Sequence, residues 1–293
     1  MSHYNKIAIL ISFFALWINM YFSNQYQQII GFVVIFLFGI LHGANDLALY
    51  QKINENKKGI LLKKILLYYI GIVLFGAFLF YSIPIVALVL FLIFSSYHFG
   101  EQHWNTLEIK KNRWLTSFQT VYGMFIFLLL FSFHQQEVKA IIYQISNVSI
   151  ASINFTTLLL MFGILMIILG WMVNSIAVKF KSEIVLNLFY LLVFAIIFKT
   201  ANLIWAFAIY FVFWHSFPSI KEQINFLYGD FTIKNFKRYF KSAFIYWFIS
   251  LLGIGILYFI FNEYKIFDAL FFSFLAAITF PHTIVIIKMQ NKL

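Results

Sequence analysis

A succession of apolar stretches, each about twenty residues long, constrains this chain more than any other feature of its sequence. About twenty apolar residues in a helix cross the hydrocarbon core of a bilayer, whereas barrel strands would alternate in polarity over about ten residues. Hydrophobic residues make up 63% of the 293 residues, and the mean hydropathy is +0.89. We therefore expect an all-α, polytopic transmembrane helix bundle that forms a single integral membrane domain, residues 1–293.

Polar and charged breaks divide the chain into about ten spans, and a count of eight or nine is also compatible with the pattern. Little more than Lys199, Thr200 and Asn202 separates the seventh span from the eighth, so this border is the least marked. The expected spans are 6–22, 29–50, 64–82, 84–104, 114–133, 152–173, 184–198, 200–218, 242–261 and 268–287.

The basic residues predict how these spans are oriented. If both termini are cytoplasmic, all but three of the 21 Lys and Arg residues fall on the cytoplasmic side, the exceptions being Lys139, Lys199 and Lys265. Cytoplasmic loops carry this excess in membrane proteins. The net charge of +11 is then an orientation signal, and we expect a multi-pass protein of the cell membrane whose partner is the lipid bilayer and not nucleic acid.

Four of the seven histidines fall at a similar depth in the predicted bundle. His42, His98, His215 and His282 lie in the second, fourth, eighth and tenth spans, which all run inward, and each lies in the cytoplasmic half of its span. The chain has no Cys, so any metal must be bound by imidazole, carboxylate or carbonyl groups. Imidazole suits iron, zinc, copper and nickel, and ionisable residues inside a span are functional by default. The pattern predicts a metal or cofactor site.

Two carboxylates accompany these histidines. Asp46 follows His42 by four residues and Glu101 follows His98 by three, so on regular helices each pair shares a face. Carboxylates in such positions orient metal-binding imidazoles, and we expect Asp46 to orient His42 and Glu101 to orient His98. His103 is five residues from His98 and points in a different direction.

The residues alone leave three function classes open. The first is a non-haem metal enzyme that acts on a lipid-soluble substrate, the second is a haem protein with pairs of axial histidines, and the third is a proton or metal-ion transporter. Membrane hydroxylases and desaturases fit poorly because the chain lacks their clustered pairs of histidines. A transporter would need polar groups on both sides of the midplane, and the outer halves of the spans have few.

Four short motifs resemble the Brp/Blh family of bacterial and archaeal β-carotene 15,15′-dioxygenases. They are His42-Gly-Ala-Asn-Asp46, Tyr97-His98-Phe99-Gly100, Phe213-Trp214-His215-Ser216 and Phe280-Pro281-His282. The resemblance extends from the second span to the tenth and rests on the order and spacing of the motifs together. It implies an Fe(II)-dependent membrane enzyme that cleaves the central double bond of β-carotene with O2 and yields two retinal molecules.

The resemblance also implies which residues bind the iron. On this analogy His42, His98 and His215 are ligands, but Ser219 stands where the family often has a further His. We assign His282 as the fourth ligand, with His103 or no fourth ligand as alternatives. Asp46 and Glu101 support the ligands, no further catalytic or cofactor-binding residue is expected, and the oligomeric state is not predicted.

Overall fold

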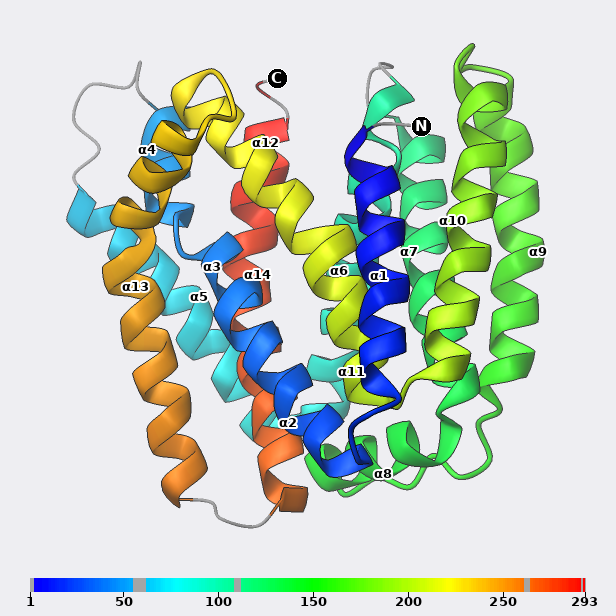
Figure 1. Ribbon diagram of the computed structural model, residues 1–293, viewed down its shortest axis with the longest axis horizontal. Coiled ribbons are helices and arrows are strands. Elements are labelled where there is room, and N and C mark those ends of the chain that lie inside the picture. The colour runs from blue at the N-terminus through cyan, green and yellow to red at the C-terminus, as the bar shows by residue number, and fades with distance from the viewer. Residues whose placement is uncertain (1–2, 55–61, 108–111, 261–263, 291, 293) are drawn as a thin grey trace. The chain divides into compact units, whose positions relative to one another are not determined.

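The computed structural model consists of helices and their connections in the residues that it describes, which are 3–54, 62–107, 112–260, 264–290 and 292 (Figure 1). In this part of the chain, eight helices are long and apolar enough to cross a membrane. The predicted all-α membrane bundle is confirmed, and the eight candidate spans among the described residues lie within the expected range of eight to ten. The chain divides into two compact units, and each is described by itself.

Unit 1 comprises Met1–Val34, Leu92–Lys139 and Ile150–His215. In this unit α7 packs along α9 and α10, and α11 packs against α2. Figure 1 shows α9 and α10 side by side. The main elements are α1 (His3–Asn19), α2 (Asn24–Val34), the second half of α6 (Pro84–His103), α7 (Arg113–Phe133), α9 (Phe155–Asn174), α10 (Phe180–Thr200), α11 (Leu203–Ile209) and the π-helix η3 (Tyr210–Ser216).

Asparagine side chains begin several of these helices. The side chain of Asn112 accepts hydrogen bonds from the backbone N–H groups of Trp114 and Leu115 at the start of α7, and Asn154 begins α9 in the same way. Asn202 accepts from the N–H group of Trp205 at the start of α11. These bonds satisfy amides that a helix leaves without a partner in its first turn. Asn202 therefore separates α10 from α11, as the sequence predicted.

Two glycines bring α6 and α7 into backbone contact. A Cβ atom at Gly100 would overlap the carbonyl oxygen of Gln119, and one at Gly123 would overlap the carbonyl oxygen of Ser96. Small residues allow membrane helices to approach closely in this way. Gly100 follows His98 by two residues, so this contact fixes the turn of α6 that carries His98.

Unit 2 comprises Ile35–Phe91, Ala140–Ser149 and Ser216–Leu293. In this unit α14 packs along α5 and against α4, and α13 contacts α3. Leu49 and Ile53 of α4 form a buried cluster with Val285, Ile286 and Met289 of α14. The main elements are the π-helix η1 (Ile35–Gly39), α3 (Ile40–Gly43), α4 (Asp46–Ile53), α5 (Leu62–Ser82), the first half of α6, the second half of α8 (Gln135–Ser146), α12 (Phe217–Tyr228), α13 (Ile233–Ile260) and α14 (Tyr264–Gln290).

The second predicted span, 29–50, is not one regular helix. It passes from α2 through η1 into α3, which ends at Gly43, and α4 begins at Asp46. Between them, Asn45 has φ −99° and ψ 11°, outside the helical region. Residues 42 and 46 therefore do not share a helical face, and this changes the assignment of Asp46.

Candidate metal centre

Unit 1 brings two of the predicted ligands together. His98 of α6 and His215 of η3 are both buried, and their ring centroids are 4.7 Å apart at an interplanar angle of 88°. Phe99 packs on the His215 ring with its centroid 4.4 Å away. The structure thus brings these two histidines together within the unit, and their role as metal ligands stays a prediction.

Gln102 fixes the orientation of His215 at two points. Its Nε2 donates to the His215 carbonyl oxygen at 3.0 Å, and its Oε1 lies 2.6 Å from His215 Nδ1. Because a carbonyl oxygen only accepts, the first bond identifies the amide nitrogen of Gln102 and thereby places Oε1 against the ring. His215 Nδ1 must therefore carry the proton, and its lone pair is on Nε2.

Glu101 follows His98 by three residues and is buried, with 4% of its surface exposed. Its Oε1 accepts a hydrogen bond from the Tyr97 hydroxyl at 3.0 Å. This bond holds the carboxylate along the α6 surface, since Tyr97 lies one turn before Glu101. The orientation of His98 by Glu101 stays a prediction.

Unit 2 brings the other two predicted ligands together. His42 of α3 and His282 of α14 are buried, with ring centroids 4.6 Å apart at an interplanar angle of 87°. The His282 Nδ1 atom lies 3.6 Å from the position that a Cβ atom would occupy at Gly43, so the backbone at Gly43 packs close to the His282 ring. The two units thus hold one buried pair of histidines each, in closely similar ring geometry.

Asp46 orients His282, a partner that the sequence did not predict. Its Oδ1 accepts from His282 Nδ1 at 2.8 Å, and its Oδ2 accepts from the Tyr69 hydroxyl at 3.0 Å. The physical reason is the break between α3 and α4, which removes the four-residue helical relation between His42 and Asp46. A carboxylate therefore does support a histidine, but that histidine lies 236 residues further along the chain.

Backbone contacts hold His42. Its Nδ1 makes a short hydrogen bond to the Gly39 carbonyl oxygen, so Nδ1 is again the protonated nitrogen. Gln223 Nε2 donates to the His42 carbonyl oxygen at 2.7 Å, and the Tyr239 hydroxyl donates to Gln223 Oε1 at 2.8 Å. Nothing in the sequence singles out Gln223 or Tyr239, which lie far from His42 in the chain.

Three of the four histidines therefore share one tautomer. Nδ1 donates to a carbonyl oxygen in His42, to an amide oxygen in His215 and to a carboxylate in His282. Each bond leaves the lone pair on Nε2, which is the arrangement that outer hydrogen bonds impose on metal-binding imidazoles. His42 and His282 of unit 2 are among the buried histidines that could hold a metal ion.

The spacing within each pair fits two neighbouring ligands of one metal. With a metal–nitrogen bond of about 2.1 Å, a bound imidazole centroid lies about 3.2 Å from the metal, so ligands at roughly right angles have centroids about 4.5 Å apart. The observed separations are 4.7 Å and 4.6 Å. Ligands on opposite sides of a metal would have centroids about 6 Å apart.

Two irregular helices lie at or beside His215 and His42, which the sequence did not predict. The π-helix η3 contains His215, and η1 ends three residues before His42. Such segments are frequent at functional sites. The indole Nε1 of Trp214 donates to Ser12 Oγ at 3.0 Å, so α1 helps to hold η3 in place.

Three other residues singled out in the sequence have structural roles. His103 packs among the rings of Tyr122, Phe194 and Tyr210. Ser219 accepts a hydrogen bond from Gln223 Nε2 at 3.0 Å, within the network that holds the His42 carbonyl group. Pro281 lies inside α14, next to His282.

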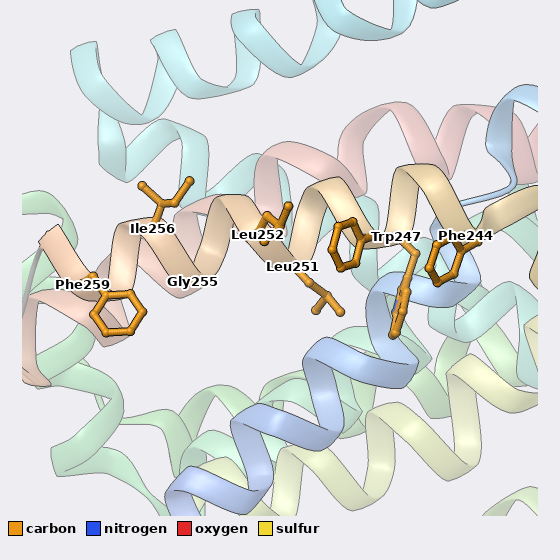
Figure 2. Close-up of a pocket in the computed structure, with 8 residues that line it drawn as sticks. Phe244, Trp247, Leu251, Leu252, Gly255, Ile256 and Phe259 are labelled. Carbon is orange, nitrogen blue, oxygen red and sulfur yellow. The ribbon is translucent and has the colours of Figure 1, made fainter.

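A pocket of about 460 Å³ lies along α13, away from these polar groups (Figure 2). Its lining contains no ionisable side chain, and the Trp247 indole donates to the Leu37 carbonyl oxygen at 2.9 Å. The pocket can therefore accommodate apolar groups but supplies no catalytic group. It is lined by Phe244, Trp247, Phe248, Leu251, Leu252, Gly255, Ile256 and Phe259.

Comparison with known proteins supports the family suggested by the four motifs. A family model described as beta-carotene 15,15′-dioxygenase matches residues 33–290, which include all four histidines. No match was found among curated proteins or among solved structures. Because the family model covers most of the chain, this membrane protein belongs to the β-carotene 15,15′-dioxygenase family.

Proposed function

We propose that this protein cleaves the central 15,15′ double bond of β-carotene with O2 at one non-haem Fe(II) ion. Its proposed ligands are His42, His98, His215 and His282. The double bond breaks and each of its carbons receives one oxygen atom, which gives two molecules of retinal. One O2 supplies both oxygen atoms, so the reaction needs no added reductant.

The observation that carries this proposal is the shared tautomer of His42, His215 and His282. A hydrogen bond from Nδ1 to an oxygen atom prepares Nε2 to bind a metal, and three independent partners provide it. A buried histidine that served packing alone would not require the same nitrogen to be engaged at all three positions. Family membership supports the carotenoid and O2 as substrates.

Bound Fe(II) would supply a site that activates O2, and neutral imidazoles leave the ion its full charge. The chain itself supplies orientation and the exclusion of water. Asp46 and Gln102 hold the rings of His282 and His215, while the apolar spans surround a lipid-soluble substrate. A long apolar cavity would set the position of cleavage by its length, because a polyene offers no polar group for recognition.

The geometry favours this proposal over the haem alternative. Axial histidines lie on opposite faces of a haem, so their ring centroids would be about 6 Å apart with the porphyrin between them. The separations of 4.7 Å and 4.6 Å within the two pairs are too short for this arrangement. The polar groups of a transport pathway would extend beyond one buried layer.

The test is expression in β-carotene-producing cells, followed by chromatography of extracted retinoids and metal analysis of the purified protein. We expect retinal as the product and iron in the protein. Alanine at His42, His98, His215 or His282 should each abolish retinal formation and lower the iron content. The control is His3→Ala, since His3 lies at the exposed start of α1.

Different outcomes would separate the alternatives. Unequal aldehyde products in place of retinal would refute central cleavage, and a Soret absorption band would indicate haem. Full activity in one alanine variant would remove that residue from the ligand set. Loss of activity in His103→Ala with retention in His282→Ala would exchange the fourth ligand.

A further inference from the structure

The first turns of α13 carry a stripe of four exposed basic residues. They are Lys234, Lys237, Arg238 and Lys241, spaced at three, four and seven positions from the first. Residues at these intervals lie on one face of a helix. No acidic residue occurs between Phe231 and Ile260, so the stripe has no counter-charge on its own helix.

Two acidic residues of α12 and of the segment before α13 accept hydrogen bonds from amide side chains. Asp230 precedes α13 and accepts from the Asn235 side chain at 2.6 Å. Glu222 of α12 accepts from Gln290 Nε2 at 3.1 Å. The guanidinium group of Arg238 stacks over the Tyr228 ring, 4.6 Å from its centroid, which fixes one end of the cation and leaves its charge exposed.

The length of α13 places this stripe at the edge of the bilayer. The helix has 28 residues and is therefore about 42 Å long, whereas the hydrocarbon core of a bilayer is about 30 Å thick. If the uncharged part from Ala243 to Ile260 fills the core, the ten residues before it extend into the headgroup layer. All four basic residues of α13 fall in those ten.

Apolar residues flank the stripe on both sides. Phe231 and Ile233 are 50% and 78% exposed just before it, and Phe244 and Ile245 are 46% and 59% exposed just after it. A soluble acidic partner would have to cover these apolar side chains, whereas the interfacial region of a bilayer accepts both them and the cations. The combination favours a lipid headgroup.

We infer that Lys234, Lys237, Arg238 and Lys241 bind the phosphates of anionic phospholipids on the cytoplasmic side of the membrane. Cytoplasmic leaflets carry negative charge, and basic residues beside a span are attracted to it. The inference concerns a lipid-binding surface and does not depend on the reaction proposed above.

The turns of α13 that carry the basic stripe also contact Asn45, close to His42 in the chain, through Tyr239 and Ser242. Tyr239 is buried, its carbonyl oxygen accepts from Asn45 Nδ2 at 2.9 Å, and Ser242 Oγ donates to Asn45 Oδ1 at 2.7 Å. A headgroup on the outer face would therefore brace the helix that positions the segment containing His42. Lipid binding should raise the thermal stability of the protein.

The experiment is native mass spectrometry of the purified full-length protein with phosphatidylglycerol or phosphatidylcholine. We expect preferential retention of phosphatidylglycerol, weakening with salt, and a rise in melting temperature with that lipid. Each basic residue near an anionic surface contributes about fivefold in affinity, so Lys237→Gln with Lys241→Gln should weaken retention about 25-fold. The matched control is Lys139→Gln with Lys199→Gln, which removes two charges that the sequence predicts on the opposite side of the membrane.

Three results would overturn the inference. They are equal retention of the two lipids, unchanged phosphatidylglycerol binding in the Lys237/Lys241 variant, and displacement of the lipid by millimolar glycerol phosphate, which would indicate a site for free phosphate. If the glutamine variant does not fold, arginine at Lys234, Lys237 and Lys241 tests the same surface. That variant keeps the charge and should retain the lipid preference.

Discussion

The two histidine pairs have nearly the same ring geometry but are supported in different ways. In unit 1 the amide of Gln102 holds His215 through its ring and its backbone carbonyl group. In unit 2 the carboxylate of Asp46 lies between His282 and Tyr69 and is only 2% exposed. The first support is neutral, whereas the second buries a negative charge that a metal ion would balance. Metal binding should therefore depend more strongly on the support in unit 2.

The largest effect is expected on stability, from a change in the contact between α6 and α7 next to His98 of unit 1. In Gly100→Ala the new methyl group would overlap the Gln119 carbonyl oxygen and force α6 and α7 apart, at a cost of about 3 kcal/mol. We expect little monodisperse protein on size-exclusion chromatography and a lowered melting temperature. The control is Gly71→Ala in α5, where no atom lies within 4 Å of the added Cβ. Equal behaviour of the two variants would show that close contact does not hold α6 in place.

Asp46→Asn should produce the next largest effect, because it removes the buried charge and keeps the shape of the side chain. Loss of a carboxylate that supports a metal-binding histidine lowers metal affinity between about 10-fold and 100-fold. Titration of the metal-free protein with Fe(II) under anaerobic conditions measures this change. Any stabilisation by Fe(II) should also become smaller in this variant, because it no longer holds a buried carboxylate whose charge the metal would balance. Unchanged affinity would contradict the role of Asp46.

Gln102→Leu tests the neutral support and should weaken Fe(II) binding by about tenfold. The variant loses two hydrogen bonds that each contribute about 1 kcal/mol and leaves His215 Nδ1 without its acceptor. Gln102→Glu restores an acceptor for the ring but not a donor for the His215 carbonyl group, so its affinity should lie between those of the wild type and the leucine variant. An effect of Gln102→Leu larger than that of Asp46→Asn would reverse the comparison between the pairs.

The sequence predicted the membrane helices and singled out the four histidines because both follow from simple patterns along the chain. Apolar runs of bilayer length specify membrane helices, and the position of each histidine along its run specifies its depth. The partner of Asp46 could not be predicted in this way, because the helical relation to His42 fails where α3 ends and α4 begins. An irregular break is set by tertiary contacts, here the bonds from Asn45 to α13, and not by local propensity.

The supporting residues on distant helices were equally beyond prediction. Tyr69 and Tyr239 are aromatic residues in a chain that is 22% aromatic, so neither stands out from its neighbours. Gln223 lies in a polar stretch that reads as an ordinary solvent-facing loop. Their roles depend on contacts between residues far apart in the chain, and one sequence carries no periodic signal for such contacts.

Tyr69→Phe should give the smallest of these effects and provides the sharpest test of how the unit 2 pair is built. The Tyr69 hydroxyl touches Asp46 and not the histidines, so its loss should weaken Fe(II) binding by only about threefold, through a less constrained carboxylate. If Tyr69 acts through the Asp46 charge, the same substitution should change Fe(II) affinity much less in an Asp46→Asn background. The four affinities form a double-mutant cycle, in which additive losses would mean that Tyr69 acts independently of Asp46. A strongly non-additive result would show that His282, Asp46 and Tyr69 act together, whereas in unit 1 the amide of Gln102 holds His215.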